Sequence, residues 1–493
     1  MFSKVKVFFC LLVLLMLVMK ALLCSSSSPS SSESISHDGT IQVDLNGEMK
    51  EHDHFHQHGS RIRFSEQNNT WMRKRLEERF LKYVQIDTQS DPHSTTVPST
   101  EKQKVLAHLL LEELKTMKGL KNVDMDQYGN VYATLPKNLE RDVLSVGFLA
   151  HMDTATEISG FNVTPCVHRN YKDGENLIVN NLTIVDYKID GKELLKMIGH
   201  DIVTASGGTL LGADDKAGIA EIMTAIEFLI ENPSIEHGDI QIGFTIDEEI
   251  GRGPHYFDIP KFSAAVAFTV DGGEKGTYNV ESFSADLVTV AFTGFNIHPG
   301  TAYSRMINSM KVAAQFLDRV NEQMPSPDIS KDREGFAHCL DINGNVEKTT
   351  IRCILRSFEE SELKQYSQEI SKIIDQLRFE HSNVTIEMNV VQQYRNMKQV
   401  LDKYPFMELS IMEVYSALNM KDIVSIPIRG GTDGSQLSWM GLPTANIFAG
   451  GHNFHSQSEF VSLHDMADSV KVIVMLSQTL SKVPPLPIMK GHH

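Results

Sequence analysis

Acidic and histidine side chains recur in this sequence at the points where short apolar runs end. They stand in "AHMDT", "FTIDEEIG", "FTVDGG" and "AGGHNFHS", as residues His151, Asp153, Asp247, Glu248, Glu249, Asp271, His452 and His455. The stretch "GADDKAGIA" adds Asp214 and Asp215 at the start of an apolar helix. Because ligand sites in α/β sheets lie beyond the carboxyl ends of the strands, we expect these side chains to converge.

Histidine nitrogen combined with carboxylate oxygen is the ligand set of a catalytic zinc or a related divalent ion. Two ions about 3.5–4 Å apart could share one bridging carboxylate and one bridging water, and Asp214 is the expected bridge. Taken singly, each of these residues is more simply a helix cap or an ordinary surface or core residue. It is their repeated position at strand ends that predicts a hydrolytic metal site.

The triplet "DEE" at 247–249 suits a division of roles. Neighbouring residues at the end of a strand point to opposite sides, so one glutamate can bind metal while the other faces the substrate. A glutamate beside two cations that does not bind them can take a proton from the bridging water and pass it to the leaving amine.

Alternating strands and helices are expected to position these residues. Apolar runs rich in β-branched residues predict strands at 143–150, 239–246 and 264–270. A helix is expected from Asp214 to about Asn232. This pattern predicts an α/β sandwich whose sheet is covered on both faces.

The pattern of expected strands and helices changes in the block 282–394. Strands are expected at "ADLVTVAFTG", "TTIRCILRSF" and "NVTIEMNVV". Helices are expected near 304–323 and 360–378. The block therefore reads as an α+β domain inserted into the first domain, which comprises 71–281 and 395–482.

The N-terminal region differs from the rest. Residues 1–24 have the layout of a secretory signal peptide, and because the apolar run is shorter than the ~20 residues of a membrane span, an uncleaved signal anchor is the alternative. Residues 25–70 read as a disordered leader rich in serine and histidine. Its tract from His52 to His58 is either a loose metal chelator or a solvated linker. We expect a secreted or extracytoplasmic protein, or a cytoplasmic one if the leader is not used.

Composition limits the classes of binding partner and the number of disulfide bonds that this protein can have. The 46 lysines and arginines against 63 acidic residues leave a net charge of -17, which disfavours nucleic acid. A membrane contact is expected only through an uncleaved anchor. Beyond residue 24 the cysteines are Cys166, Cys339 and Cys353, so at most one pair can form a disulfide.

Several motifs in order resemble peptidase T, the tripeptide aminopeptidases among the di-zinc metallopeptidases. They include "AHMDTA", "TLLGADDKAGIAEIMTA", "TVDGGEKG", "IHPGTA", "IRGGTDGSQLSWMGLP" and "GGHNFHS". The resemblance extends from about Trp71 to Ser481. It implies a zinc-exopeptidase-like catalytic sandwich with a lid or dimerisation domain in the inserted block, and two zinc ions per subunit.

Carried over residue by residue, the resemblance implies one zinc on His151 and Asp271, another on Glu249 and His455, and Asp214 as the bridge. It makes Glu248 the general base, Asp153 the carboxylate that orients His151, and His298 a residue that stabilises the oxyanion, often across a homodimer. Arg356, Asn396 and Arg429 fall where related enzymes hold the peptide.

The expected activity is hydrolysis of the N-terminal residue of short peptides, chiefly tripeptides. Sister families share the metal centre, so a dipeptidase, a carboxypeptidase or an N-acyl amino acid deacylase is the alternative. A non-catalytic peptide-binding protein would need a lost ligand or a lost base, and the sequence shows neither.

Overall fold

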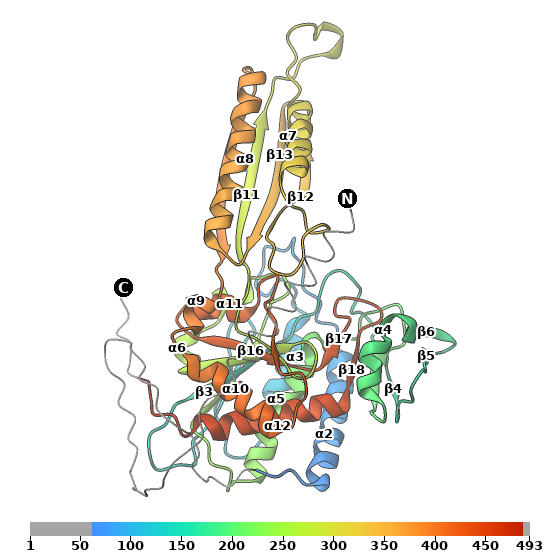
Figure 1. Cartoon of the computed structure of the whole chain (residues 1–493), viewed down its shortest axis with the longest axis vertical. Helices are drawn as coiled ribbons and strands as arrows, with labels where there is room; N and C mark the ends of the chain where they lie inside the picture. The colour runs from blue at the N-terminus through green and yellow to red at the C-terminus, as the bar shows by residue number, and fades with distance from the viewer. Residues whose placement is uncertain (1–61, 487–493) are drawn as a thin grey trace, which may run out of the picture. The chain divides into compact units, whose positions relative to one another are not determined.

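The computed structural model describes residues 62–486 (Figure 1). The predicted signal segment 1–24 and the histidine tract lie outside these residues. The first described helix, α2, begins at Glu66 and so includes residues 66–70, which the sequence analysis placed in the leader. A side-chain cap from Ser65 accounts for this start, because its hydroxyl accepts a backbone N–H of the first turn. Within 62–486 no helix combines the length and apolarity that a membrane crossing requires.

An eight-stranded sheet forms the centre of the catalytic part. Its order is β1-β2-β8-β3-β9-β16-β10-β15, and β8, β3, β9 and β16 are mutually parallel neighbours. The strands are β1 (Lys121–Met125), β2 (Val131–Leu135), β8 (Ile240–Thr245), β3 (Val146–His151), β9 (Val266–Gly272), β16 (Thr444–Phe448), β10 (Thr277–Asn279) and β15 (Val424–Ser425). The runs predicted at 143–150, 239–246 and 264–270 correspond to β3, β8 and β9.

Helices cover the sheet because successive strand residues face opposite sides. On one face, Phe148, Ile242 and Phe268 join the main core with α5, α12 and α2, and Figure 1 shows α12 beside α5. On the other face, Leu149 and Ala267 pack in a smaller cluster with residues of α6 and α11. The helices of this part are α2 (Glu66–Val84), α3 (Gln103–Thr116), α4 (Tyr187–Leu194), α5 (Ala213–Glu231), α6 (Ile259–Phe262), α9 (Lys398–Leu401), α10 (Pro405–Ala417), α11 (Asp433–Trp439) and α12 (Leu463–Leu480).

A small second sheet, which the sequence did not predict, carries one of the histidines. Its order is β17-β18-β7-β4, and a separate hairpin pairs β5 with β6. The strands are β17 (Gly451–His452), β18 (Phe460–Ser462), β7 (Ile202–Ala205), β4 (Pro165–His168), β5 (Leu177–Val179) and β6 (Leu182–Val185). His452 lies in β17 with its ring stacked on Phe460, 4.8 Å between ring centroids, whereas His455 follows the strand.

The inserted block forms a four-stranded antiparallel sheet in the order β12-β13-β11-β14. Its elements are β11 (Ser284–Thr293), α7 (Ser309–Gln323), β12 (Phe336–Gly344), β13 (Lys348–Ser357), α8 (Glu360–Glu380) and β14 (Thr385–Tyr394). Both helices cover the same face of the sheet, where Val290, Phe316 and Ile370 belong to one core. We call this unit the lid.

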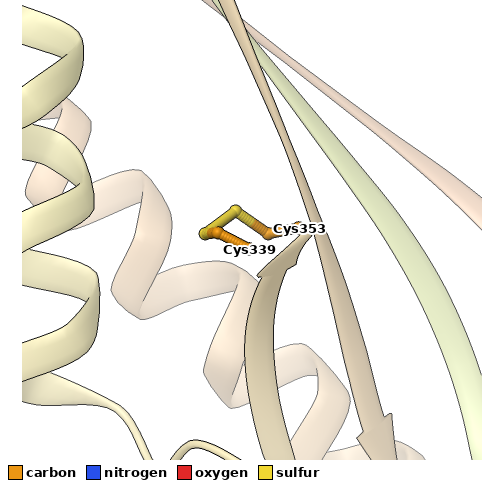
Figure 2. The surroundings of a disulfide bond; sticks show 2 residues. All are labelled: Cys339 and Cys353. Atoms are coloured by element: carbon orange, nitrogen blue, oxygen red, sulfur yellow. A yellow bond between two sulfur atoms is a disulfide. The ribbon is translucent and has the colours of Figure 1, made fainter. Parts of the chain in front are cut away.

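One disulfide joins two strands of the lid, and Figure 2 shows it between Cys339 of β12 and Cys353 of β13. These two residues are direct partners across the two strands. The expectation of at most one bridged pair agrees with this bond, and Cys166 is a free thiol.

Candidate metal centre

Parallel strands bring the candidate ligands to one edge of the eight-stranded sheet. β3 ends at His151, and β9 carries Asp271 near its end. β8 ends at Thr245, and Glu248 and Glu249 follow it. Because the carboxyl ends of parallel neighbours meet at the same edge, residues far apart in sequence become close in space.

The side chains form two triads that share Asp214. In the first triad, His151 Nε2 lies 2.8 Å from Asp214 Oδ1 and 3.5 Å from Asp271 Oδ1. In the second triad, His455 Nε2 lies 3.2 Å from Asp214 Oδ2 and 3.1 Å from Glu249 Oε2. Each oxygen of Asp214 therefore faces a different histidine, which is the arrangement that a carboxylate bridging two cations needs.

Two of the acids and both histidines of the triads have raised pKa values, which fits a buried site for cations. Burial raises the pKa of Asp271 to about 6 and the pKa of Glu249 to about 8. The hydrogen bond to Asp214 raises the pKa of His455 to about 11. Glu249 Oε1 is buried without a hydrogen-bond partner. A divalent cation in each triad would replace these protons and take up the free oxygen, so the donor set fits two metal ions.

Asp153 connects the first triad to the two glutamates. Its backbone carbonyl oxygen lies 3.0 Å from His151 Nδ1, and its carboxylate Oδ1 lies 3.5 Å from the same nitrogen. Its carboxylate oxygens accept the backbone N–H groups of Glu248 at 3.0 Å and Glu249 at 3.2 Å. The sequence assigns the carboxylate to His151, but in the structure the carbonyl makes the closer contact and the carboxylate holds the turn of the two glutamates.

The two aspartates at the start of α5 have different tasks. Asp214 and Asp215 have non-helical backbone angles, so the regular helix begins after them. Asp215 is fully buried and accepts the backbone N–H groups of His151 and Gly218, each at 3.2 Å. Its oxygens belong to neither triad. Asp214 thus faces the metal centre, while Asp215 joins α5 to β3.

Glu459, which the sequence analysis missed, holds the loop that carries Asp214. It is 1% exposed and accepts the backbone N–H groups of Leu211 at 2.7 Å, Gly212 at 2.8 Å and Asp214 at 3.0 Å. Three donors on one buried carboxylate fix the backbone of the loop that carries Asp214. No local pattern marks Glu459, because its partners lie far away in the chain.

Glu248 lies beside the triads and belongs to neither. Burial raises its pKa well above the ordinary value, and the charge of Asp271 adds to the increase. Its side chain forms no hydrogen bond with another described residue. A carboxyl with a raised pKa and no hydrogen-bond partner is suited to accept and return a proton.

Two residues expected to bind the peptide instead make contacts around the lid. Arg429 donates to the backbone carbonyls of Asp332 and Glu334, each at 3.0 Å, and to Ser330 Oγ at 2.8 Å. Asn396 is 4% exposed, and its side-chain oxygen accepts two backbone N–H groups. Both side chains are thus engaged by other described residues, and a role for either of them in holding the peptide stays a prediction.

Arg356 is the third residue expected to contact the peptide. It donates to Gln393 Oε1 at 2.9 Å, and its guanidinium carbon lies 5.0 Å from the centroid of the Tyr394 ring. Burial lowers its pKa, and it forms no ion pair with a carboxylate of residues 62–486. Burial raises the pKa of Tyr394, Arg356 opposes that increase and Glu248 adds to it, so these groups share one neighbourhood.

His298 lies exposed in the lid, just before the short helix Pro299–Thr301. Its Nδ1 accepts the backbone N–H of Gly300 at 3.1 Å. No hydrogen bond or ion pair among the described residues connects His298 to either triad. Its role at an oxyanion, from this subunit or across a homodimer, stays a prediction.

The parallel strand ends, the two candidate ligand triads and the free glutamate are the arrangement of a metal-dependent hydrolase. The sequence model of Peptidase family M20/M25/M40 matches residues 204–479. Peptidase T from Geobacillus sp. is 47% identical over 407 residues, which cover 82% of this chain and 98% of that protein.

Two solved structures are also similar. Aminopeptidase PepT from Bacillus cereus has a TM-score of 0.62 at 21% identity, covering 83% of this chain and 98% of that chain. A tripeptidase from Staphylococcus aureus has a TM-score of 0.61 at 20% identity, covering 83% of this chain and 99% of that chain. The chain therefore belongs to Peptidase family M20/M25/M40 and, within it, to the peptidase T group. It is a metallopeptidase.

Proposed function

We propose that this metallopeptidase removes the N-terminal residue of short peptides, chiefly tripeptides, with two zinc ions per subunit. The observation that carries the proposal is the unpaired Glu248 beside two triads that share Asp214. Imidazole nitrogen and carboxylate oxygen suit zinc. The similarity to peptidase T and to a tripeptidase supports the substrate class.

The chain's own groups supply the proton transfers. The two triads would hold one ion each, and these ions would polarise the scissile carbonyl and make the attacking water more acidic. Glu248 takes a proton from the attacking water and gives it to the leaving amine. Asp153 holds the backbone of Glu248, so the base keeps its position during both transfers.

A peptide panel with and without a chelator tests the proposal. The purified protein should release the first residue of unmodified tripeptides, and a chelator should stop this until zinc is returned. N-blocked tripeptides should resist cleavage. Preferred cleavage of N-acylated compounds would indicate the deacylase alternative, and release from the other end would indicate a carboxypeptidase.

Arg356 is proposed to bind the terminal carboxylate of the peptide, because its planar fork can bond both oxygens. Arg356→Met should raise KM for free tripeptides by roughly 10- to 100-fold, as expected from losing a hydrogen bond to a charged group. The KM for C-amidated tripeptides should change little. Steady-state kinetics on matched acid and amide substrates measure the difference.

Arg429→Met is the comparison. Because Arg429 binds backbone carbonyls around the lid, this variant should lower the melting temperature more than it changes the ratio between acid and amide substrates. If Arg429→Met abolished the preference for the free carboxylate and Arg356→Met did not, the assignment would be reversed.

An oxidising compartment is proposed for the mature protein. The Cys339–Cys353 bond supports it, because disulfides persist mainly in secreted and extracytoplasmic proteins, and the signal-like sequence of residues 1–24 agrees. Thiol titration of the denatured exported protein should detect Cys166 without reductant, and Cys339 and Cys353 only after reduction. Reaction of all three without reductant would contradict the proposal.

A further inference from the structure

Asp433 is a buried acid with one unused oxygen. It is the first residue of α11 and is 4% exposed. Its Oδ2 accepts a hydrogen bond from Thr245 Oγ1 at 2.7 Å, whereas its Oδ1 is buried without a partner. A buried carboxylate oxygen without a donor is unfavourable, so the position calls for a ligand that can donate.

Asp433 lies beside the metal centre. Thr245, its hydrogen-bond donor, is the register partner of His151 across β8 and β3. The groups that act most strongly on the charge of Asp433 include His151, Asp271 and Asp153, and none of those groups is a lysine or an arginine. The free oxygen therefore lies near the reaction site and lacks a cationic partner of its own.

Two further unpaired oxygens accompany it on the same segment. Thr432 Oγ1 and Gln436 Oε1 are buried without partners, and these residues are 6% and 8% exposed. Gln436 follows Asp433 by three positions on α11, so these two side chains are neighbours on the helix surface, and Thr432 directly precedes Asp433 in the chain. Gln436 Nε2 donates to the carbonyl of Gly251 at 3.1 Å, and the N–H of Gly251 donates to the carbonyl of Glu248 at 2.7 Å. The unpaired oxygens thus lie beside the turn of the general base.

Other buried acids near the triads either belong to a triad, as Glu249 does, or already have donors. Asp153 and Asp215 each accept two backbone N–H groups, and Glu459 accepts three. Glu248 is reserved for proton transfer in the proposed mechanism. Asp433 is therefore the acid in this neighbourhood that can serve a substrate cation.

We infer that Asp433 receives the α-ammonium group of the substrate, with Thr432 and Gln436 as additional acceptors. The inference rests on the proposed function, because attack on the first peptide bond places the α-nitrogen about 2.5 Å from the attacked carbon. An ammonium group carries a positive charge and three N–H donors, which match one carboxylate oxygen and two neutral oxygens. A peptide with a blocked N-terminus has neither the positive charge nor the three N–H donors. Asp433 therefore selects for free amino termini.

Matched ligands with and without the amino group test the inference. Ala-Ala-Ala is compared with propionyl-Ala-Ala as substrate, and alanine hydroxamate with propionohydroxamate as a metal-binding inhibitor. Asp433→Asn keeps an acceptor for Thr245 but replaces the charged oxygen. It should lower kcat/KM for Ala-Ala-Ala by about 100-fold or more and leave the value for propionyl-Ala-Ala within about threefold.

Binding of the hydroxamates, measured by calorimetry on the zinc-loaded protein, does not depend on turnover. The unaltered protein should bind alanine hydroxamate at least about tenfold more tightly than propionohydroxamate, and Asp433→Asn should remove this difference. Equal binding of the two hydroxamates by the unaltered protein would overturn the inference even if Asp433→Asn failed to fold.

Two controls separate the alternatives. Thr245→Val removes the hydrogen bond that orients Asp433 and should lower kcat/KM for Ala-Ala-Ala by less than Asp433→Asn does, because the carboxylate itself remains. Glu157, whose Oε2 lies 3.5 Å from His455 Nδ1 and whose side chain is 60% exposed, is the competing acid. Loss of amine selectivity in Glu157→Gln but not in Asp433→Asn would refute the inference.

Absence of any peptide hydrolysis by the unaltered protein, with amine selectivity intact in hydroxamate binding, would refute the proposed function alone.

Discussion

Replacement of Glu248 by glutamine is expected to lower kcat on tripeptides by about 100- to 10,000-fold, the range typical of losing a general acid or base. Glutamine keeps the size of the side chain but cannot accept the proton from water. Because Glu248 belongs to neither triad, the variant should still bind two zinc ions. Steady-state kinetics combined with metal analysis after dialysis measure both quantities.

The neighbouring glutamate provides the control. Glu249 Oε2 lies 3.1 Å from His455 Nε2, so Glu249→Gln should weaken metal binding as well as turnover. Adjacent residues of the same type should thus give different results. Unchanged turnover in Glu248→Gln would remove this residue from the proton transfers, and loss of metal in that variant would place it among the ligands.

Asp214→Asn should abolish activity by removing both metal ions. Its two oxygens contact the two histidines, at 2.8 Å and 3.2 Å, so the amide would disturb both triads at once. Mutating a residue that only hydrogen-bonds to a metal ligand typically lowers metal affinity by about 10- to 100-fold. Mutating a ligand shared by two ions should therefore lower zinc affinity by more than about 100-fold. Titration with zinc in the presence of a competing chelator measures the loss.

Asp215→Asn is the matched control for this experiment. Asp215 is adjacent and fully buried, but its oxygens accept backbone N–H groups and do not enter a triad. This variant should lose thermal stability and retain most of its zinc affinity. If Asp215→Asn lost both metals and Asp214→Asn retained them, the two aspartates would have exchanged roles.

The lid shows which structural features can be predicted from local residue patterns and which cannot. Alternating apolar residues predict β11 and β13, and the structure has them at Ser284–Thr293 and Lys348–Ser357. The pairing of Cys339 with Cys353 requires the register between two strands, which the sequence does not contain. The sequence limited the cysteines to one bridge, and the strand register determined which one.

The residues expected to bind the peptide also show that local sequence patterns do not determine long-range hydrogen bonds. Arg356 and Arg429 are equally plausible from the resemblance alone, since both are arginines in matching motifs. In the tertiary structure Arg429 donates to backbone carbonyls around the lid, whereas Arg356 donates, among the described residues, only to Gln393, and this difference supports the proposal that Arg356 binds the peptide. Which hydrogen bonds a long side chain makes depends on segments distant in the chain.

By itself, the sequence determined the α/β architecture and the gathering of His151, Asp214 and Asp271 at one sheet edge. It could do so because strand periodicity is local and because parallel strands bring their carboxyl ends to a common edge. Only the tertiary structure decided that Glu459 holds the loop that carries Asp214 and that Asp433 keeps a free oxygen. Those facts depend on which buried donors lie within about 3 Å of each acceptor, and that is settled by packing between distant segments.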